Sequence, residues 1–379
     1  MTTTPPTPTD PAFDPAVLGT PQRPTFGLDT FGDTGTGPDG GPRPQAEAIR
    51  EVVAEGVLAD EVGVDYLGLG EHHREDYAIS APDVVLAAIA GQTERIRLGT
   101  GVTVLSSDDP IRVFQRFSTL AAISRGRAEV QLGRGSFTES FPLFGLDLSD
   151  YEVLFHEKLD LFAHLQQEQP LTWRGSVRPP LEEQQVFPRT EAGLPAWIAV
   201  GGTPQSVIRA AAYGFPLVLA VIGGSPAAFV QFADLYRRAL VEYGRPELPI
   251  GMHSPGHVAA TDELAREQMF PHQAEAFGKI GRERGWGPYS RAGFDQGASP
   301  EGSIFVGSPE TVRAEIADRG QALAVRVARA GRLPTLDLGV SSPTVVPTQS
   351  VYVDLGALAP GQTVTVYPPP GAPTQGLFA

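Results

Sequence analysis

Apolar runs alternate with amphipathic stretches along most of the chain. The run Val64 to Gly70 is apolar or glycine apart from Asp65, and it ends abruptly at three titratable residues, Glu71 to His73. A helical stripe over Gln45 to Glu61 precedes it. A short apolar run that follows a helix is typical of a strand buried on both faces, as in a parallel sheet.

The same alternation recurs, and it predicts seven strands separated by helices. We expect strands at 25–29, 64–70, 97–105, 128–133, 196–200, 216–222 and 249–259, and helices at 45–61, 81–91, 111–124, 151–167, 207–213, 227–243 and 262–284, with a further helix opened by Ser308-Pro309-Glu310. Strands that alternate with helices indicate parallel βα units. No G-x-G-x-x-G follows a strand, so a dinucleotide-binding Rossmann fold lacks its fingerprint. We therefore predict an α/β fold, a (β/α)8 TIM barrel with insertions, which needs roughly 250 residues.

The two ends of the chain differ from this barrel region, which we place at 25–330. Residues 1–24 are rich in Thr and Pro and are expected to be disordered. Helical periodicity stops after Ala330, and prolines punctuate the tail, 331–379. The last βα unit is therefore expected to be irregular or missing: Leu333 to Val340 could form an eighth strand, but no amphipathic eighth helix follows. Residues 170–195 and 285–303 are expected to be irregular insertions.

Composition excludes several classes of function. The net charge of −15 disfavours nucleic-acid and anionic-membrane partners. The chain has no cysteine, so it has no disulfide framework, thiolate metal site or cysteine nucleophile. No signal peptide and no run of roughly 18 apolar residues is found, and a cytoplasmic protein is the expectation.

Candidate chemistry lies at the carboxyl ends of the strands, where α/β folds bind ligands. Glu71, His72 and His73 end one strand, although Glu71 and one histidine could instead form an ion pair at the rim. Arg134 ends another strand between two glycines, which leaves its guanidinium accessible to phosphate or carboxylate. The alternative is an ordinary rim arginine paired with Glu139 or another acid.

A glycine turn at 201–206 offers a candidate anion site. Gly201 and Gly202 let the backbone approach a ligand, Thr203 can cap the following helix, Pro204 takes its first position, and Ser206 lies in its first turn. A plain strand–helix turn is the alternative reading. The turn at 307–310 is a rival, but Glu310 would repel a phosphate, so we favour the earlier turn.

Two further features of the sequence concern small residues and histidines. Residues 99–102 end a strand with little side chain and could let a flat ring lie against the backbone, or could merely fit a crowded barrel interior. His253 and His257 share a strand, but their spacing does not match a metal hydrolase, and neighbouring His72 and His73 point to opposite sides. We expect no metal site.

Four of these segments together resemble the bacterial-luciferase-like flavin-dependent monooxygenase family, over about Phe26 to Ala330. They are 69–73 (LGEHH), 99–102 (GTGV), 133–135 (GRG) and 201–204 (GGTP). The resemblance implies a (β/α)8 barrel that binds reduced FMN, or in a sister group the deazaflavin F420.

The resemblance also implies roles for individual positions. His72 matches an active-site histidine, and Gly101 and Val102 match a place where an unusual cis peptide lies against the flavin ring. Arg134, Gly201, Gly202, Thr203 and Ser206 match the phosphate-binding region. Gly133 stands where some members carry a cysteine, so a thiol role is absent.

The implied reaction uses reduced FMN and O2 to oxygenate a small organic substrate. Electrons would come from NAD(P)H, directly or through a separate flavin reductase, and a homodimer is compatible with the family. Two alternatives remain open: an F420-dependent oxidoreductase of the same fold, and a non-catalytic relative that binds flavin or a partner barrel.

Overall fold

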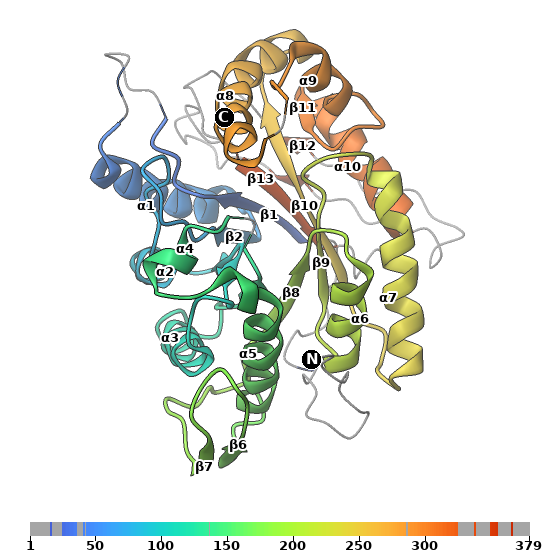
Figure 1. Cartoon of the computed structure of the whole chain (residues 1–379). Coiled ribbons are helices and arrows are strands. Elements are labelled where there is room, and N and C mark those ends of the chain that lie inside the picture. The colour runs from blue at the N-terminus through green and yellow to red at the C-terminus, as the bar shows by residue number, and fades with distance from the viewer. Residues whose placement is uncertain are drawn as a thin grey trace.

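A sheet of ten strands forms the centre of the structure, and helices surround it (Figure 1). The computed structural model describes residues 16, 25–35, 41, 43–135, 137–285, 287–324, 337–338, 349–354 and 365–366. The expected disorder of 1–24 and most of the tail, 331–379, therefore lie outside the described residues.

The parallel strands of the barrel lie at or close to the segments that the sequence predicts as strands. They are β1 (Thr25–Thr30), β2 (Tyr66–Leu69), β3 (Arg97–Thr100), β4 (Thr103–Val104), β5 (Val130–Gly133), β8 (Ala196–Val200), β9 (Leu217–Ala220) and β10 (Ile250–Val258). The strand order is β3-β2-β1-β13-β10-β9-β8-β5-β4, and β11 (Phe305–Gly307) pairs with the end of β10. A parallel bridge between Leu98 and Ala128 joins β3 to the residues before β5 and closes the sheet on itself.

The place of the eighth strand is taken by an antiparallel strand. β13 (Gln349–Asp354) lies between β1 and β10 and pairs antiparallel with both (Figure 1). Most of Leu333 to Val340, which the sequence suggested as an eighth strand, lies outside the described residues. Its described part, β12 (Asp337–Leu338), pairs instead with β14 (Thr365–Val366). Pro334 lacks the N–H that a strand paired on both sides needs, whereas 349–354 contains no proline. The fold is thus a (β/α)8 barrel whose last unit is irregular.

Helices cover the outside of the barrel. They are α1 (Gln45–Val62), α2 (Pro82–Ala90), α3 (Pro110–Ile123), α4 (Ser140–Leu143), α5 (Tyr151–Leu165), α6 (Pro204–Tyr213), α7 (Val230–Glu242), α8 (Asp262–Arg284), α9 (Arg291–Gly297) and α10 (Pro309–Ala324), with short 3-10 turns η2 (Leu148–Asp150) and η3 (Pro226–Phe229). Side-chain hydrogen bonds and prolines determine where several of these helices begin. Asp109 caps α3 by accepting from the N–H groups of Ile111 and Arg112, and Pro110 follows as the first helical residue.

Three segments differ from the sequence prediction. The strand expected over 97–105 is broken into β3 and β4 by a cis peptide between Gly101 and Val102. The segment 170–195 contains a hairpin, β6 (Leu171–Trp173) and β7 (Leu181–Gln184), which projects at the lower end of Figure 1. The segment 285–303 contains α9. Short elements such as these carry too few residues to show a period.

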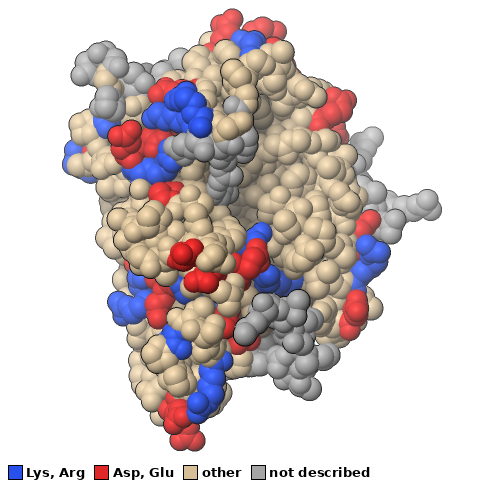
Figure 2. All heavy atoms as spheres, in the orientation of Figure 1, with Lys and Arg blue, Asp and Glu red and all other residues tan. Residues whose placement is uncertain are grey.

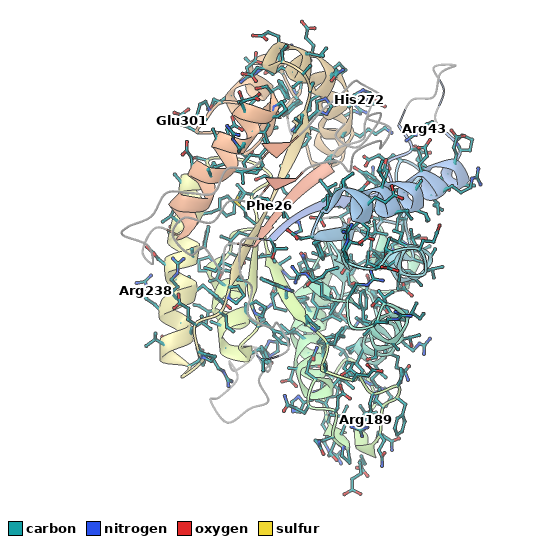
Figure 3. All side chains as sticks on the ribbon, turned by 180° about the vertical axis from the view of Figure 1, so that it is seen from behind. Phe26, Arg43, Arg189, Arg238, His272 and Glu301 are labelled. Carbon is teal, nitrogen blue, oxygen red and sulfur yellow. The ribbon has the colours of Figure 1, made fainter. Side chains whose placement is uncertain are left out.

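Two kinds of packing stabilise the barrel. Apolar side chains between strands and helices form one large cluster, and Figure 3 shows side chains filling the space around the ribbon, with Phe26 on β1 near the middle of the view. Inside the barrel, Tyr66 and Trp197 pack together with Val218. The Tyr66 hydroxyl donates to the carbonyl of Thr100 and accepts from the amide of Gln131, which satisfies its polar end away from water.

Candidate functional site

The parallel pairing brings the ends of four strands to one edge of the barrel. Leu69 on β2 is in register with Thr100 on β3, and Val104 on β4 is in register with Gly133 on β5. β5 in turn pairs parallel with β8. The segments that follow these strands, and with them His72, Gly101, Arg134 and Gly201, therefore leave the sheet at the same edge.

His72 is nearly buried in a cage of aromatic rings. Its ring centroid lies 4.9 Å from Phe31, 4.6 Å from Tyr77 and 4.7 Å from Phe137. Its Nδ1 lies 3.2 Å from Oε1 of Glu139. Burial alone would raise the pKa of Glu139, but the hydrogen bond with His72 and other hydrogen bonds outweigh it and hold that pKa below its usual value. Glu139 thus orients the imidazole and leaves Nε2 as the ring nitrogen for chemistry.

His73 has a different partner. Its Nε2 lies 3.1 Å from Oε1 of Glu71, and this hydrogen bond raises the pKa of His73 against the opposing effect of partial burial. The other oxygen of Glu71 accepts from the N–H of Val104 at 3.0 Å. The ion pair that the sequence allowed at the rim therefore forms with His73, and His72 is left for Glu139.

Arg134 belongs to a basic cluster that already holds a carboxylate. Its guanidinium pairs with Glu152 and lies 5.3 Å from the centre of the Tyr151 ring. Arg209 also contacts Glu152, at 3.3 Å. The acid partner that the sequence allowed for Arg134 is Glu152, not Glu139. Two guanidinium groups converging on one exposed carboxylate form a site that suits an anion.

The turn at 201–206 lies beside this cluster, because Arg209 follows Ser206 by one turn of α6. Gly202 has φ +101°, which favours glycine, and a Cβ on Gly201 would meet nothing within 4 Å. Thr203 occupies the N-cap position, but its hydroxyl donates to Oγ of Ser206 at 2.8 Å and does not cap the backbone. The space beside Gly201 and the N-terminus of α6 can therefore accommodate a ligand group.

At the rival turn at 307–310, a neighbouring acid already accepts hydrogen bonds. The N–H of Ser308 and the hydroxyl of Thr311 both donate to the carboxylate of Asp262, at 2.6 Å and 2.9 Å. An acid already occupies this turn, which supports the preference for the earlier one.

One loop connects the histidine to the basic cluster. The residues that follow β5 carry Arg134 at the cluster, and Phe137 and Glu139 against His72. The hydroxyl of Tyr151 donates to the carbonyl of Gly135 at 2.9 Å and ties this loop to α5. His72 and the basic cluster of Arg134 and Arg209 therefore lie at the same end of the barrel, which we call the mouth. On the face in Figure 2, charged side chains of both signs are scattered, and some of them lie near its middle.

Sequence reasoning missed several residues of this mouth. Glu152 and Arg209 lie far from Arg134 in sequence, and no local pattern links them. The aromatic rings around His72 come from three separate segments. Within the described ranges, no three His, Asp or Glu side chains gather in a way that could hold a metal, and no helix there is long and apolar enough to cross a membrane. His253 lies against Asp29, and His257 against Gln268.

Comparison with known proteins gives a consistent result. A protein of Bacillus subtilis strain 168, YvbT, is 27% identical over 289 residues, which are 72% of this chain and 82% of that protein. The alkanal monooxygenase alpha chain of the Kryptophanaron alfredi symbiont is 26% identical over 58% of this chain. The matched region spans only 61% of that alpha chain.

Solved structures share the same architecture. Monooxygenase RslO1 from Streptomyces bottropensis has a TM-score of 0.67 and 25% identity, over 78% of this chain and 88% of that one. Two more distant structures show the fold alone. One is the oxygenating constituent of 3,6-diketocamphane monooxygenase of Pseudomonas putida in complex with FMN (TM-score 0.63, 18% identity, covering 79% and 89%). The other is an F420-dependent secondary alcohol dehydrogenase (TM-score 0.63, 16% identity, covering 79% and 91%).

A profile described as luciferase-like monooxygenase matches residues 27–326, which run from Gly27 on β1 to beyond β11. This chain belongs to the luciferase-like monooxygenase family.

Proposed function

We propose that the protein is a flavin-dependent monooxygenase that uses reduced FMN and O2 to oxygenate a small organic substrate. The observation that carries this proposal is the loop after β5, which joins His72, through Glu139, to the basic cluster around Arg134. An imidazole and an anion site at one mouth suit a cofactor that has a phosphate at one end and a reactive ring at the other.

The residues present fit such a cofactor. The guanidinium groups of Arg134 and Arg209, the hydroxyl of Ser206 and the N-terminus of α6 would hold the phosphate. Gly201, Gly202 and Thr203 would line its approach. Gly101 and Val102, whose peptide is cis at the position where the family resemblance places such a bond, would support the ring.

When bound, reduced flavin supplies the electrons with which O2 is activated and one oxygen atom is transferred. The chain's own residues supply the surroundings. The aromatic rings of Phe31, Tyr77 and Phe137 exclude water around His72. Glu139 fixes the imidazole through Nδ1, so that Nε2 can give or take a proton.

Substitution of His72 tests the catalytic role. His72→Ala should lower substrate oxygenation about 100-fold or more, while the affinity for FMN changes little because the phosphate cluster is intact. His73→Ala is the matched control, since its ring meets Glu71 instead. Oxygenation is measured as incorporation of 18O from 18O2 into a panel of small carbonyl and aromatic compounds, and affinity by titration. Unchanged oxygenation in the His72 variant would show that His72 has no catalytic role, whereas flavin binding without any oxygenation by the wild-type protein would favour the non-catalytic alternative.

The second candidate is an F420-dependent oxidoreductase, which the structural likeness to an F420-dependent alcohol dehydrogenase favours. Competition between FMN and F420 separates the two. We expect FMN to bind and F420 not to displace it at equal concentration. Displacement of FMN by F420 would favour the second candidate. Electron supply from NAD(P)H, a separate reductase and a homodimer belong to the same proposal.

A further inference from the structure

Two buried polar side chains of the barrel have no part in the function proposed above. Asp29, on β1, is 1% exposed, and His253, on β10, is 7% exposed. Nδ1 of His253 lies 2.7 Å from Oδ2 of Asp29, within ion-pair distance. A carboxylate so far from water is costly unless it is paired, so this contact is what allows an acid in the barrel interior.

A glycine on β2 and a glycine just after β3 make room for this pair. A Cβ on Gly68 would overlap Oδ1 of Asp29, and a Cβ on Gly101 would lie only 2.8 Å from the same oxygen. The carboxylate therefore lies against Gly101, the residue on which the cofactor ring is proposed to rest. Asp29 is in register with Gly68 at the mouth half of β1, so the pair adjoins the mouth.

The other ionisable groups of the barrel interior are arranged differently. Glu129, 1% exposed, pairs with Arg97 at 2.9 Å, where β3 begins and just before β5 starts. Tyr66 fills the space between, with its hydroxyl held by Thr100 and Gln131. Among the described residues, the Glu129–Arg97 pair thus lies at the end of the interior where β3 begins, and the Asp29–His253 pair lies at the other end, where Asp29 contacts Gly101.

We propose that Asp29 and His253 are positioning residues beneath the cofactor ring, and that their charges set the relative affinity of the site for oxidised and reduced flavin. This inference rests on the proposed function, because it needs a flavin ring at Gly101 and Val102. Reduction of FMN at neutral pH takes up two electrons and one proton, so the ring gains one negative charge. A carboxylate behind Gly101 opposes that charge, and the imidazole that faces the carboxylate offsets the opposition.

Two variants separate this role from a structural one. Asp29→Asn keeps the size of the side chain and removes the negative charge. We expect the ratio of the Kd for oxidised FMN to the Kd for dithionite-reduced FMN to rise about tenfold, which is about 30 mV for a two-electron couple. His253→Asn keeps a donor near the position of Nδ1 and removes the group that can carry positive charge. Its ratio should fall below that of the wild-type protein.

Opposite behaviour of the two variants is the signature, because a merely structural pair would weaken the binding of both flavin forms alike in both variants. Glu129→Gln is the control: it removes an equally buried acid from the other end of the interior and should leave the ratio unchanged. Circular dichroism checks folding, and Asp29→Ser replaces Asp29→Asn if the latter does not fold.

The outcomes distinguish this inference from the proposed function. If the wild-type protein binds FMN and the Asp29 variant shows no rise in the ratio, or if both variants shift the ratio in the same direction, the inference is wrong and the proposed function stands. If the wild-type protein binds no FMN in either form, the proposed function fails, and the inference fails with it.

Discussion

The basic residues described at the mouth each pair with an acidic side chain. Glu71 binds His73, Glu139 binds His72, and Glu152 bridges Arg134 and Arg209. The first two acids fix imidazole rings in place. Glu152 differs, because it is exposed and sits where a phosphate would be expected.

Replacement of Glu152 tests whether this carboxylate competes with the phosphate. Glu152→Gln should tighten the binding of FMN roughly twofold to fivefold, in keeping with the small worth of exposed ion pairs. Arg134→Ala should weaken it about tenfold or more, because a charged hydrogen bond is lost. Fluorescence titration measures both. Weaker binding by the Glu152 variant would mean that this acid supports the site rather than competes for it.

The strand ends could be predicted from the sequence, but the partners at those ends could not. Apolar runs followed by polar residues located His72, Arg134 and the turn at 201–206. The pairing of Glu139 with His72, and of Glu152 with Arg134, depends on loop paths that leave no periodic pattern. Asp29 carries a signal in the sequence, because it is an acid inside an apolar strand and glycines stand at 68 on β2, at 99 on β3 and at 101 just after β3.

At the scale of elements, Asp60 joins the end of α1 to the start of β3. Its carboxylate accepts from the N–H groups of Glu94, Arg95 and Ile96, at 3.1, 2.9 and 2.6 Å. Partial burial alone would raise the pKa of Asp60, but these hydrogen bonds outweigh burial and lower it. The carboxylate thus accepts hydrogen bonds from backbone N–H groups of the loop that leads into β3. Without it, these N–H groups would have no partner in a helix or a strand.

Asp60→Asn should lower the free energy of unfolding by about 1–3 kcal/mol at neutral pH, because charged hydrogen bonds are lost. The pKa is lower in the folded protein, so ionised Asp60 stabilises the fold above its unfolded pKa of about 3.9, and this stability is lost as pH falls through the folded pKa. The difference between variant and wild type should therefore shrink below about pH 4. Urea unfolding across pH measures it.

Glu61→Gln, at the exposed neighbour, is the control and should change the free energy of unfolding by less than about 0.5 kcal/mol. A difference between Asp60→Asn and wild type that persists undiminished into acid would show that the contribution is not that of an ionised carboxylate.

For the whole molecule, the antiparallel β13 is the feature that departs most from a regular barrel. It fills the gap between β1 and β10, with Val353 in register with Phe26 on one side and Met252 on the other. Such a strand removes the two exposed edges that an unfinished barrel would present. The sequence predicted an irregular last unit but not which segment would close it, because strand pairing over long separations depends on the rest of the fold.

A proline in this strand tests its role in closure. Val351→Pro removes a backbone N–H from a strand paired on both sides and should destabilise the protein by about 3 kcal/mol or more. Val351→Thr keeps the β-branched shape and should cost much less. Chemical unfolding compares them. Equal stability of the proline variant and the wild-type protein would show that β13 does not close the barrel in solution.

A crystal structure with FMN bound tests most directly whether His72 and the basic cluster hold one cofactor between them. We expect the phosphate within hydrogen-bond distance of the Arg134 guanidinium and the Ser206 hydroxyl, the ring against Gly101 and Val102, and its edge toward His72. A phosphate bound elsewhere, or a ring that does not reach His72, would contradict the shared site.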